Sequence, residues 1–154
     1  MRAGALVLLA CCSQVLAAEP PSVEAAAARF VPDVTWRAGS VVKGDFSCRG
    51  RVEQAILGTN PADIVIAIFL HGTTKPPEIL RYSAKARRAE SAELKIESLD
   101  FTPQELKEIA DSIGGEIPPG LRASKTCKGL NLSDGDSAHI YWNHKARRFD
   151  DWSL

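Results

Sequence analysis

The chain has 154 residues, of which 45% are hydrophobic and 25% are charged, and its 19 basic residues balance its 19 acidic residues. Balanced charge creates no field that would attract a polyanion, so no nucleic-acid partner is expected. The length suits one domain, and no second domain is needed.

The first 17 residues are predicted to be a secretory signal peptide. Met1 and Arg2 form a basic start, residues 3–10 are apolar, and Val15-Leu16-Ala17 fits a cleavage site. The apolar run is far shorter than the roughly 20 residues that a membrane span needs, and no later segment comes close. We therefore expect a secreted or periplasmic protein without a membrane span. An alternative makes residues 8–11 a lipoprotein box, with a lipid anchor on Cys11.

Residues 18–154 are predicted to form a single α+β domain. It begins with a short helix that Ser22 can cap and that Pro32 ends. The apolar residues of this helix recur at helical spacing: Val23, Ala26, Ala27 and Phe30. A strand is expected at 34–42.

The segment after this strand has the spacing of a calcium-binding loop. Asp45, Ser47 and Glu53 fall at its first, third and ninth positions, and Gly50 falls at the sixth. The fifth position is Arg49, whose guanidinium can only donate hydrogen bonds. Two interpretations remain open: a weak Ca²⁺ site formed by the three oxygen ligands, or a cation-free loop in which Arg49 neutralises the two carboxylates. Charge counting favours the second interpretation.

Further strands are expected at 52–57, 63–70, 78–82 and 93–99, where β-branched and aromatic residues are bounded by turn signals. Residues 63–70 are rich in Ile and Val without interruption by polar residues, which is typical of a central strand covered on both faces.

A helix is predicted from Pro103 to Ile113, because Thr102 and Glu105 form a capping box and the apolar residues lie on one side. Two final strands, 137–143 and 148–154, form a hairpin that places Trp142 and Trp152 in the core. We predict an antiparallel sheet of six or seven strands, with this amphipathic helix packed on one face.

Removal of the signal peptide leaves two cysteines, Cys48 and Cys127. An even pair in an oxidising compartment predicts a disulfide, and the alternative is two buried thiols. The bond would close a loop of about 80 residues, for which the chain-entropy estimate is at most about 4 to 5 kcal/mol.

The loop and its flanks resemble a known family. Gly44-Asp45-Phe46-Ser47, Gly50, Glu53 and Ala55-Ile56-Leu57 are similar to the loop and following strand of FG-GAP (VCBS-like) repeats, in which an acidic loop binds calcium. Arg49 departs from this pattern, since it replaces an acidic ligand. The lead-in residues 30–36 resemble those of small bacterial periplasmic proteins that carry one such loop.

This resemblance has two implications. Cys48 beside the loop implies that a covalent tie to Cys127 holds it. Some proteins with similar loops are inhibitors or immunity proteins that block cell-wall-degrading enzymes, so a peptidoglycan hydrolase is one implied partner.

The residue types do not assemble into a catalytic site with a nucleophile, a base and an orienting group, and no zinc spacing is present. Non-enzymatic binding of another envelope protein is therefore the leading hypothesis, with inhibition of a peptidoglycan hydrolase as a narrower form. From a different class, a small hydrolase or carbohydrate-active enzyme would require His71, His139 or His144 to meet a carboxylate in a cleft.

Overall fold

A computed structural model of the chain describes residues 19–85, 88–134 and 136–153. Within these ranges the protein has nine strands, in two antiparallel sheets, and two α-helices. The predicted signal peptide and Cys11 lie outside the described residues. Neither described helix is long and apolar enough to cross a membrane.

The first sheet is built around β3 and β4. Its strands are β1 (Thr35–Trp36), β2 (Val42–Gly44), β3 (Glu53–Thr59), β4 (Asp63–Phe69) and β5 (Glu78–Ser83). Both β1 and β2 pair with β3, which is followed by β4 and β5. The short 3₁₀ turn Ala38–Ser40 separates β1 from β2.

The second sheet is a meander in which each strand pairs with the next. Its strands are β6 (Glu93–Leu99), β7 (Ser124–Ser133), β8 (Ser137–Asn143) and β9 (Arg148–Ser153). A second 3₁₀ turn, Ala89–Ser91, precedes β6.

The predicted α+β class, with one sheet of six or seven strands, is therefore wrong, because the protein is mostly β. Two local features explain the error. The strand expected at 34–42 is broken by the 3₁₀ turn into β1 and β2, and the sequence pattern predicts no strand in the range of β7. Without β7, the strands β6, β8 and β9 cannot be recognised as a separate sheet.

The core between the sheets follows from the alternation of side chains along each strand. On β4, Ile64, Ile66 and Ile68 pack against the second sheet, among Leu130, Ile140 and other apolar residues. The alternate residues Val65, Ala67 and Phe69 point to the opposite face. Strand β4 is thus buried on both faces, as its sequence predicts.

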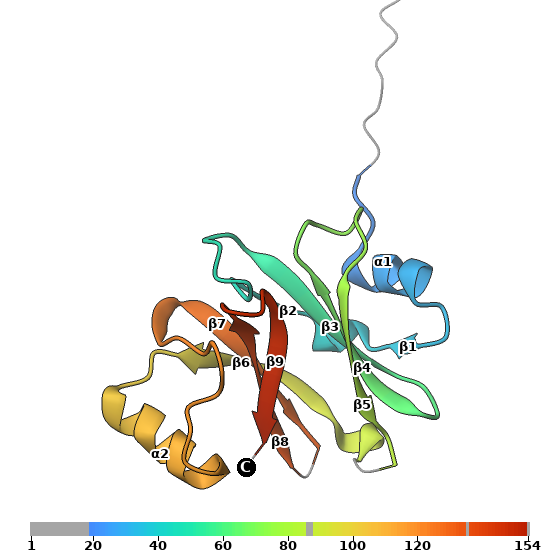
Figure 1. Cartoon of the computed structure of the whole chain (residues 1–154). Coiled ribbons are helices and arrows are strands. Elements are labelled where there is room, and N and C mark those ends of the chain that lie inside the picture. Colours follow the sequence, from blue (N-terminus) through green and yellow to red (C-terminus); the bar gives the residue numbers. More distant parts are fainter. Residues whose placement is uncertain (1–18, 86–87, 135, 154) are drawn as a thin grey trace, which may run out of the picture.

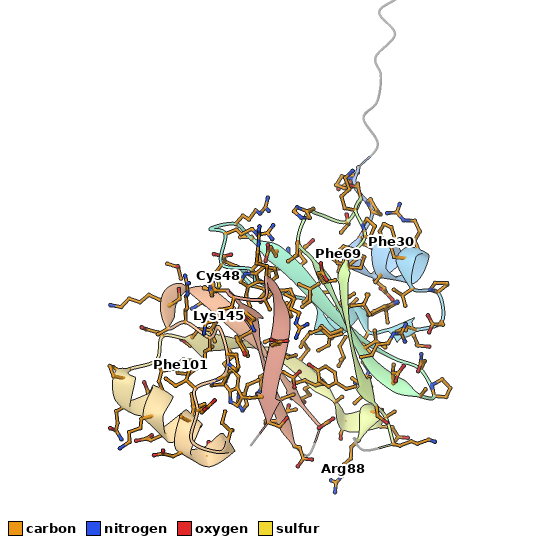
Figure 2. The ribbon with its side chains drawn as sticks, in the orientation of Figure 1. Phe30, Cys48, Phe69, Arg88, Phe101 and Lys145 are labelled. Atoms are coloured by element: carbon orange, nitrogen blue, oxygen red, sulfur yellow. A yellow bond between two sulfur atoms is a disulfide. The ribbon has the colours of Figure 1, made fainter. Side chains whose placement is uncertain are left out.

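Each sheet carries one helix on its outer face, and Figure 1 shows the two helices on opposite sides of the strands. Helix α1 (Val23–Phe30) starts after Ser22, whose side chain accepts a hydrogen bond from the backbone N–H of Ala25. It covers Val65, Ala67 and Phe69, and Figure 2 shows Phe69 close to this helix.

Helix α2 (Pro103–Ile113) covers the outer face of the second sheet and has the bounds that the sequence predicts. Both hydrogen bonds of the capping box between Thr102 and Glu105 are formed, and Gly114 ends the helix with φ of 115°. Ile109 and Ile113 pack towards Tyr141 and Trp152 in a small third cluster. This packing creates a groove along α2.

Candidate functional site

The loop between β2 and β3 is organised by the carboxylate of Asp45. Its two oxygens accept hydrogen bonds from the successive backbone N–H groups of Arg49 and Gly50, each at 2.8 Å. Cys48 and Gly50 have positive φ values of 57° and 73°, which turn these N–H groups inward. The backbone thus forms a small anion-binding concavity that is filled by the protein's own aspartate.

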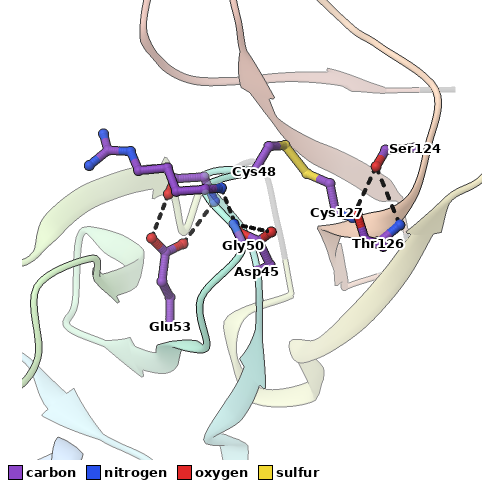
Figure 3. The surroundings of a disulfide bond; sticks show 9 residues. Asp45, Cys48, Gly50, Glu53, Ser124, Thr126 and Cys127 are labelled. Carbon is purple, nitrogen blue, oxygen red and sulfur yellow. Dashed lines mark hydrogen bonds between the residues drawn. A yellow bond between two sulfur atoms is a disulfide. The ribbon is translucent and has the colours of Figure 1, made fainter.

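Glu53 plays a similar part at the other end of the loop. It is buried, and its two oxygens accept from the backbone N–H of Ser47, at 2.8 Å, and from the hydroxyl of Ser47, at 2.5 Å. Figure 3 shows both carboxylates facing donors of the loop. Charged acceptors make stronger hydrogen bonds than neutral ones, so these contacts hold the loop in shape.

The structure differs from the predicted pairing of Arg49 with the two carboxylates. The Arg49 guanidinium lies 5.4 Å from the ring centroid of Trp142, which is within the range of a cation–π contact. Among the described residues, Arg49 makes no ion pair with Asp45 or Glu53. Backbone and hydroxyl donors, rather than the guanidinium, satisfy these carboxylates.

The predicted disulfide is confirmed. Cys48 and Cys127 are bonded, with 4.9 Å between their Cα atoms, and they are 79 positions apart in the sequence. The bond joins the loop to β7 (Figure 3), and the backbone N–H of Lys128 donates to the carbonyl oxygen of Asp45 at 3.0 Å. The loop joins β2 to β3 in the first sheet, and it is also bonded to β7 of the second sheet.

The proposed calcium ligands lie near one another in sequence, but they do not form a cation cage. All four carboxylate oxygens of Asp45 and Glu53 accept hydrogen bonds from the loop itself. In the described part of the chain, no group of three histidine, cysteine or acidic residues is arranged to hold a metal ion.

A depression of about 530 Å³ lies beside this loop, and we call it the loop hollow. Its exposed hydrophobic residues are Val52 and Ile96, which are 75% and 47% exposed. Its cations are Lys43, Arg51 and Lys128. Among the described residues of its lining the one acidic side chain, that of Asp45, is bound to backbone N–H groups, and the other charged residues are cations.

A second depression, of about 410 Å³, runs between α2 and the outer face of the second sheet, and we call it the α2 groove. Its polar floor contains Glu97 and His139, and the Nδ1 atom of His139 lies 2.7 Å from Oε1 of Glu97. The imidazole ring stacks on Trp152, with 5.0 Å between ring centroids and 12° between planes. This cluster meets the condition set for the hydrolase alternative, that a histidine meets a carboxylate in a cleft.

The other two histidines do not join it. His71 is exposed in the turn after β4, and His144 follows β8, where its backbone N–H donates to the carbonyl of Gly120. Burial, aided by the charge of Arg122, lowers the pKa of His144 and so favours its neutral form. Neither lines the α2 groove.

Sequence reasoning missed most of the residues of both depressions. Alternation along β6 predicts that Ile96 and Glu97 point to opposite faces, but it does not show whether another element covers them. Trp152 was expected in the core, and it is indeed 7% exposed, although it also lines the α2 groove. The available signal was the stretch Arg51-Val52, in which an isolated apolar residue follows a run of loop residues.

Comparisons with known proteins leave the resemblance to FG-GAP repeats as a prediction. The chain matches no model of a protein family, no curated protein and no solved structure. The two depressions are therefore the features of this protein that point to a function.

Proposed function

We propose that this is an exported, non-enzymatic binding protein of the cell envelope, which docks an acidic segment of a partner protein in the loop hollow. The observation that carries the proposal is the position of Val52 and Ile96. They are two of the three large hydrophobic side chains that are exposed among the described residues, and both line the same depression. Exposed apolar groups gathered within a polar rim are typical of interaction sites.

The cationic residues of the loop hollow indicate that its partner is acidic. Lys43, Arg51 and Lys128 line the same depression as Val52 and Ile96, and none of them forms an ion pair with another described residue. A partner segment with carboxylates beside an apolar side chain would complement this surface, and it would be steered towards it at low salt.

Export is supported by the sequence of residues 1–17 and by the disulfide, since disulfides persist in oxidising compartments. The periplasm or the extracellular space is therefore the proposed location. The narrower proposal, inhibition of a peptidoglycan hydrolase, predicts that the purified protein lowers the rate of cell-wall lysis.

The test compares two variants with matched chemistry. Val52→Asp places a negative charge in the lining of the loop hollow, whereas Ile117→Asp makes the same kind of change at the third exposed hydrophobic residue, which is outside it. Affinity capture from an envelope extract should recover the same acidic partner with the wild type and Ile117→Asp, and should lose it with Val52→Asp. Capture that is equal for both variants would rule out the loop hollow as the docking site.

The contribution of these cationic residues to binding can be tested with the recovered partner. Arg51→Glu should weaken binding by more than the roughly two- to five-fold that one exposed ion pair contributes, because it also adds repulsion. Lys107→Glu, on the exposed side of α2, should leave affinity unchanged. Affinity that does not fall with rising salt would contradict an acidic partner.

A second candidate, a small hydrolase or carbohydrate-active enzyme, is favoured by one observation, the contact of His139 with Glu97 in the α2 groove. A carboxylate can orient a histidine as a general base. The test is turnover of ester, glycoside and muropeptide substrates by the wild type and by His139→Gln. The candidate requires turnover that the variant loses, and a wild type without turnover on all three substrate types would eliminate it.

A further inference from the structure

The α2 groove contains an unusual set of polar atoms. Among the described residues, three buried side-chain nitrogen or oxygen atoms have no hydrogen-bond partner, namely Oε2 of Glu97, Nε2 of His139 and Nε1 of Trp152. All three residues line this groove. A buried polar atom left without a partner costs about 1 to 3 kcal/mol, so three of them in one place call for a functional explanation.

The cluster is held rigidly. Strands β6, β8 and β9 supply its three residues, Oε1 of Glu97 lies 2.7 Å from Nδ1 of His139, and His139 stacks on Trp152. Phe101 packs edge-on against Trp152, with 6.5 Å between ring centroids. Trp152 is 7% exposed, so its indole N–H is fixed in direction by packing on several sides.

The charge of the groove is negative. Glu97, Glu105 and Glu108 line it, and none of the described lysines or arginines does. Hydrogen bonds from the backbone and side chain of Thr102 lower the pKa of Glu105, which keeps this carboxylate ionised at neutral pH. Glu108 accepts a hydrogen bond from Gln104 at 2.9 Å and is exposed on the rim.

The walls of the groove are apolar. Phe101 and Ile109 from the α2 side pack with Trp152 from β9, and all three line the groove beside its acidic residues. A ligand that fits therefore combines an aliphatic chain with a terminal cation. An ammonium group suits these acceptors, because it offers three donors in a compact head.

We propose that the α2 groove binds a lysyl group, with the ammonium at the carboxylates, the butyl chain on Phe101 and Ile109, and a backbone carbonyl of the ligand accepting from the cluster's N–H donor. This site lies behind the loop hollow, since Ile96 and Glu97 are adjacent on β6 and point to opposite faces. It is therefore independent of the proposed docking of an acidic partner.

The experiment titrates the purified protein, with its disulfide intact, with Nα-acetyl-lysine methylamide and follows the indole N–H resonances by NMR. The Trp152 resonance should shift saturably, while those of Trp36 and Trp142 should not. The matched ligand, acetylated at Nε, keeps the chain but loses the charge, and it should bind at least tenfold more weakly. Equal binding of the two ligands, or an unmoved Trp152 resonance, would overturn the proposal.

Two exposed positions on α2 provide matched variants. Glu108→Gln should weaken binding of the lysyl ligand by about two- to five-fold, the contribution of an exposed ion pair. Asp111→Asn removes the same charge from the same helix outside the groove and should leave affinity unchanged. An equal effect of both variants would show a general attraction of cations to α2 instead of a site.

A third ligand distinguishes two natural sources of an ammonium group on an aliphatic chain: a free diamine and a lysyl group. If 1,5-diaminopentane binds as tightly as the lysyl ligand, the ammonium and its chain supply the affinity and a free diamine would suffice as the natural ligand. If the diamine binds at least tenfold more weakly, the carbonyl contributes and the natural ligand is a lysyl group of a peptide or protein. If no lysyl ligand binds the α2 groove, the test of the loop hollow is unaffected, because the two sites are independent.

Discussion

At the scale of single residues, Asp45 and Glu53 show how a loop with calcium-like spacing can be held without an ion. Their four oxygens are matched to donors inside the loop, which include three backbone N–H groups. The spacing predicts that these residues converge on a loop, and they do. The spacing cannot show whether these carboxylates bind a cation or N–H groups, because both kinds of partner require carboxylates at such positions.

A metal-removal experiment tests this difference. We expect thermal unfolding at the same temperature in calcium and in EDTA, since a ligand that binds only the folded state would raise the melting temperature. Glu53→Ala should lower the free energy of unfolding by about 1 to 3 kcal/mol in either buffer, because it leaves the buried N–H of Ser47 without its partner. Glu116→Ala, at an exposed position, is the control. A calcium-dependent rise in melting temperature would contradict the internal arrangement.

Tyr141 makes a prediction about alkaline pH. Burial, with added repulsion from Asp150 and Asp151, raises the pKa of Tyr141 to about 12. Its hydroxyl donates to the carbonyl of Pro119 at 2.9 Å. An unfolded tyrosine titrates near 10, so below pH 10 both states keep the proton and the stabilisation is complete. As pH rises from about 10 towards 12, the unfolded state loses its proton first, and stability falls by up to about 1.4 kcal/mol per pH unit.

The measurement is urea denaturation from pH 7 to pH 11, with the wild type and Tyr141→Phe side by side. At pH 7 the variant should be less stable by about 1 kcal/mol, because the hydrogen bond to Pro119 is lost. That difference should shrink above pH 10. Two curves that stay parallel across the whole range would show that Tyr141 does not titrate differently in the folded and unfolded states.

At the scale of elements, local sequence signals predict the bounds of a helix or strand well where residues that start and end it lie within the segment. Helix α2 has a capping box at Thr102 and a left-handed glycine at Gly114, and its predicted bounds are those of the structure. Strands β6 and β8 also begin and end where alternation predicts. In each case the decisive interactions lie within a few residues of one another.

Strand β7 shows where local signals were not enough. Only its second half alternates clearly, with Leu130 and Leu132 facing the core, while its first half contains Lys125, Thr126 and Lys128. That half is shaped by distant partners: it pairs with β6 across a register shift, and Cys127 is bonded to the β2–β3 loop. The division of the strands into two sheets depends on β7. Because β7 itself is not evident from the local sequence, this division could not be predicted.

The capping box of α2 can be tested directly. Thr102→Ala removes the side-chain acceptor for the N–H of Glu105, at 3.2 Å, and should lower the free energy of unfolding by about 1 kcal/mol. Lys107→Ala, at an exposed position of the same helix, should have little effect, since alanine favours helix. Chemical denaturation measures both. Equal stability of wild type and Thr102→Ala would mean that packing of Ile109 and Ile113 alone holds α2 in place.

At the scale of the whole molecule, the two depressions lie on opposite faces of the second sheet, and each is bordered by an element from outside it. The α2 groove requires helix α2, and the loop hollow requires the β2–β3 loop of the first sheet. The sequence could predict the loop and the helix separately. Their relation to β6 depends on long-range packing, so neither depression could be predicted from sequence patterns.

The disulfide ties these parts together, and its reduction is the broadest test of the fold. Cys48 belongs to the loop of the first sheet and Cys127 to β7 of the second, so the bond links the two sheets at the edge of the loop hollow. For a closed loop of this length, the chain-entropy estimate is at most about 4 to 5 kcal/mol. Reductant should therefore lower the free energy of unfolding, measured in urea, by a large fraction of that value.

The double variant Cys48→Ala/Cys127→Ala supplies the control. Its stability should match that of the reduced wild type and should not respond to reductant, because no bond remains to be broken. Its loop should also exchange backbone hydrogens faster at Arg49 and Gly50, whose N–H groups are fixed on Asp45 while the bond holds Cys48. If the exchange is unchanged while global stability falls, the carboxylates alone shape the loop, and the bond acts on the unfolded chain only.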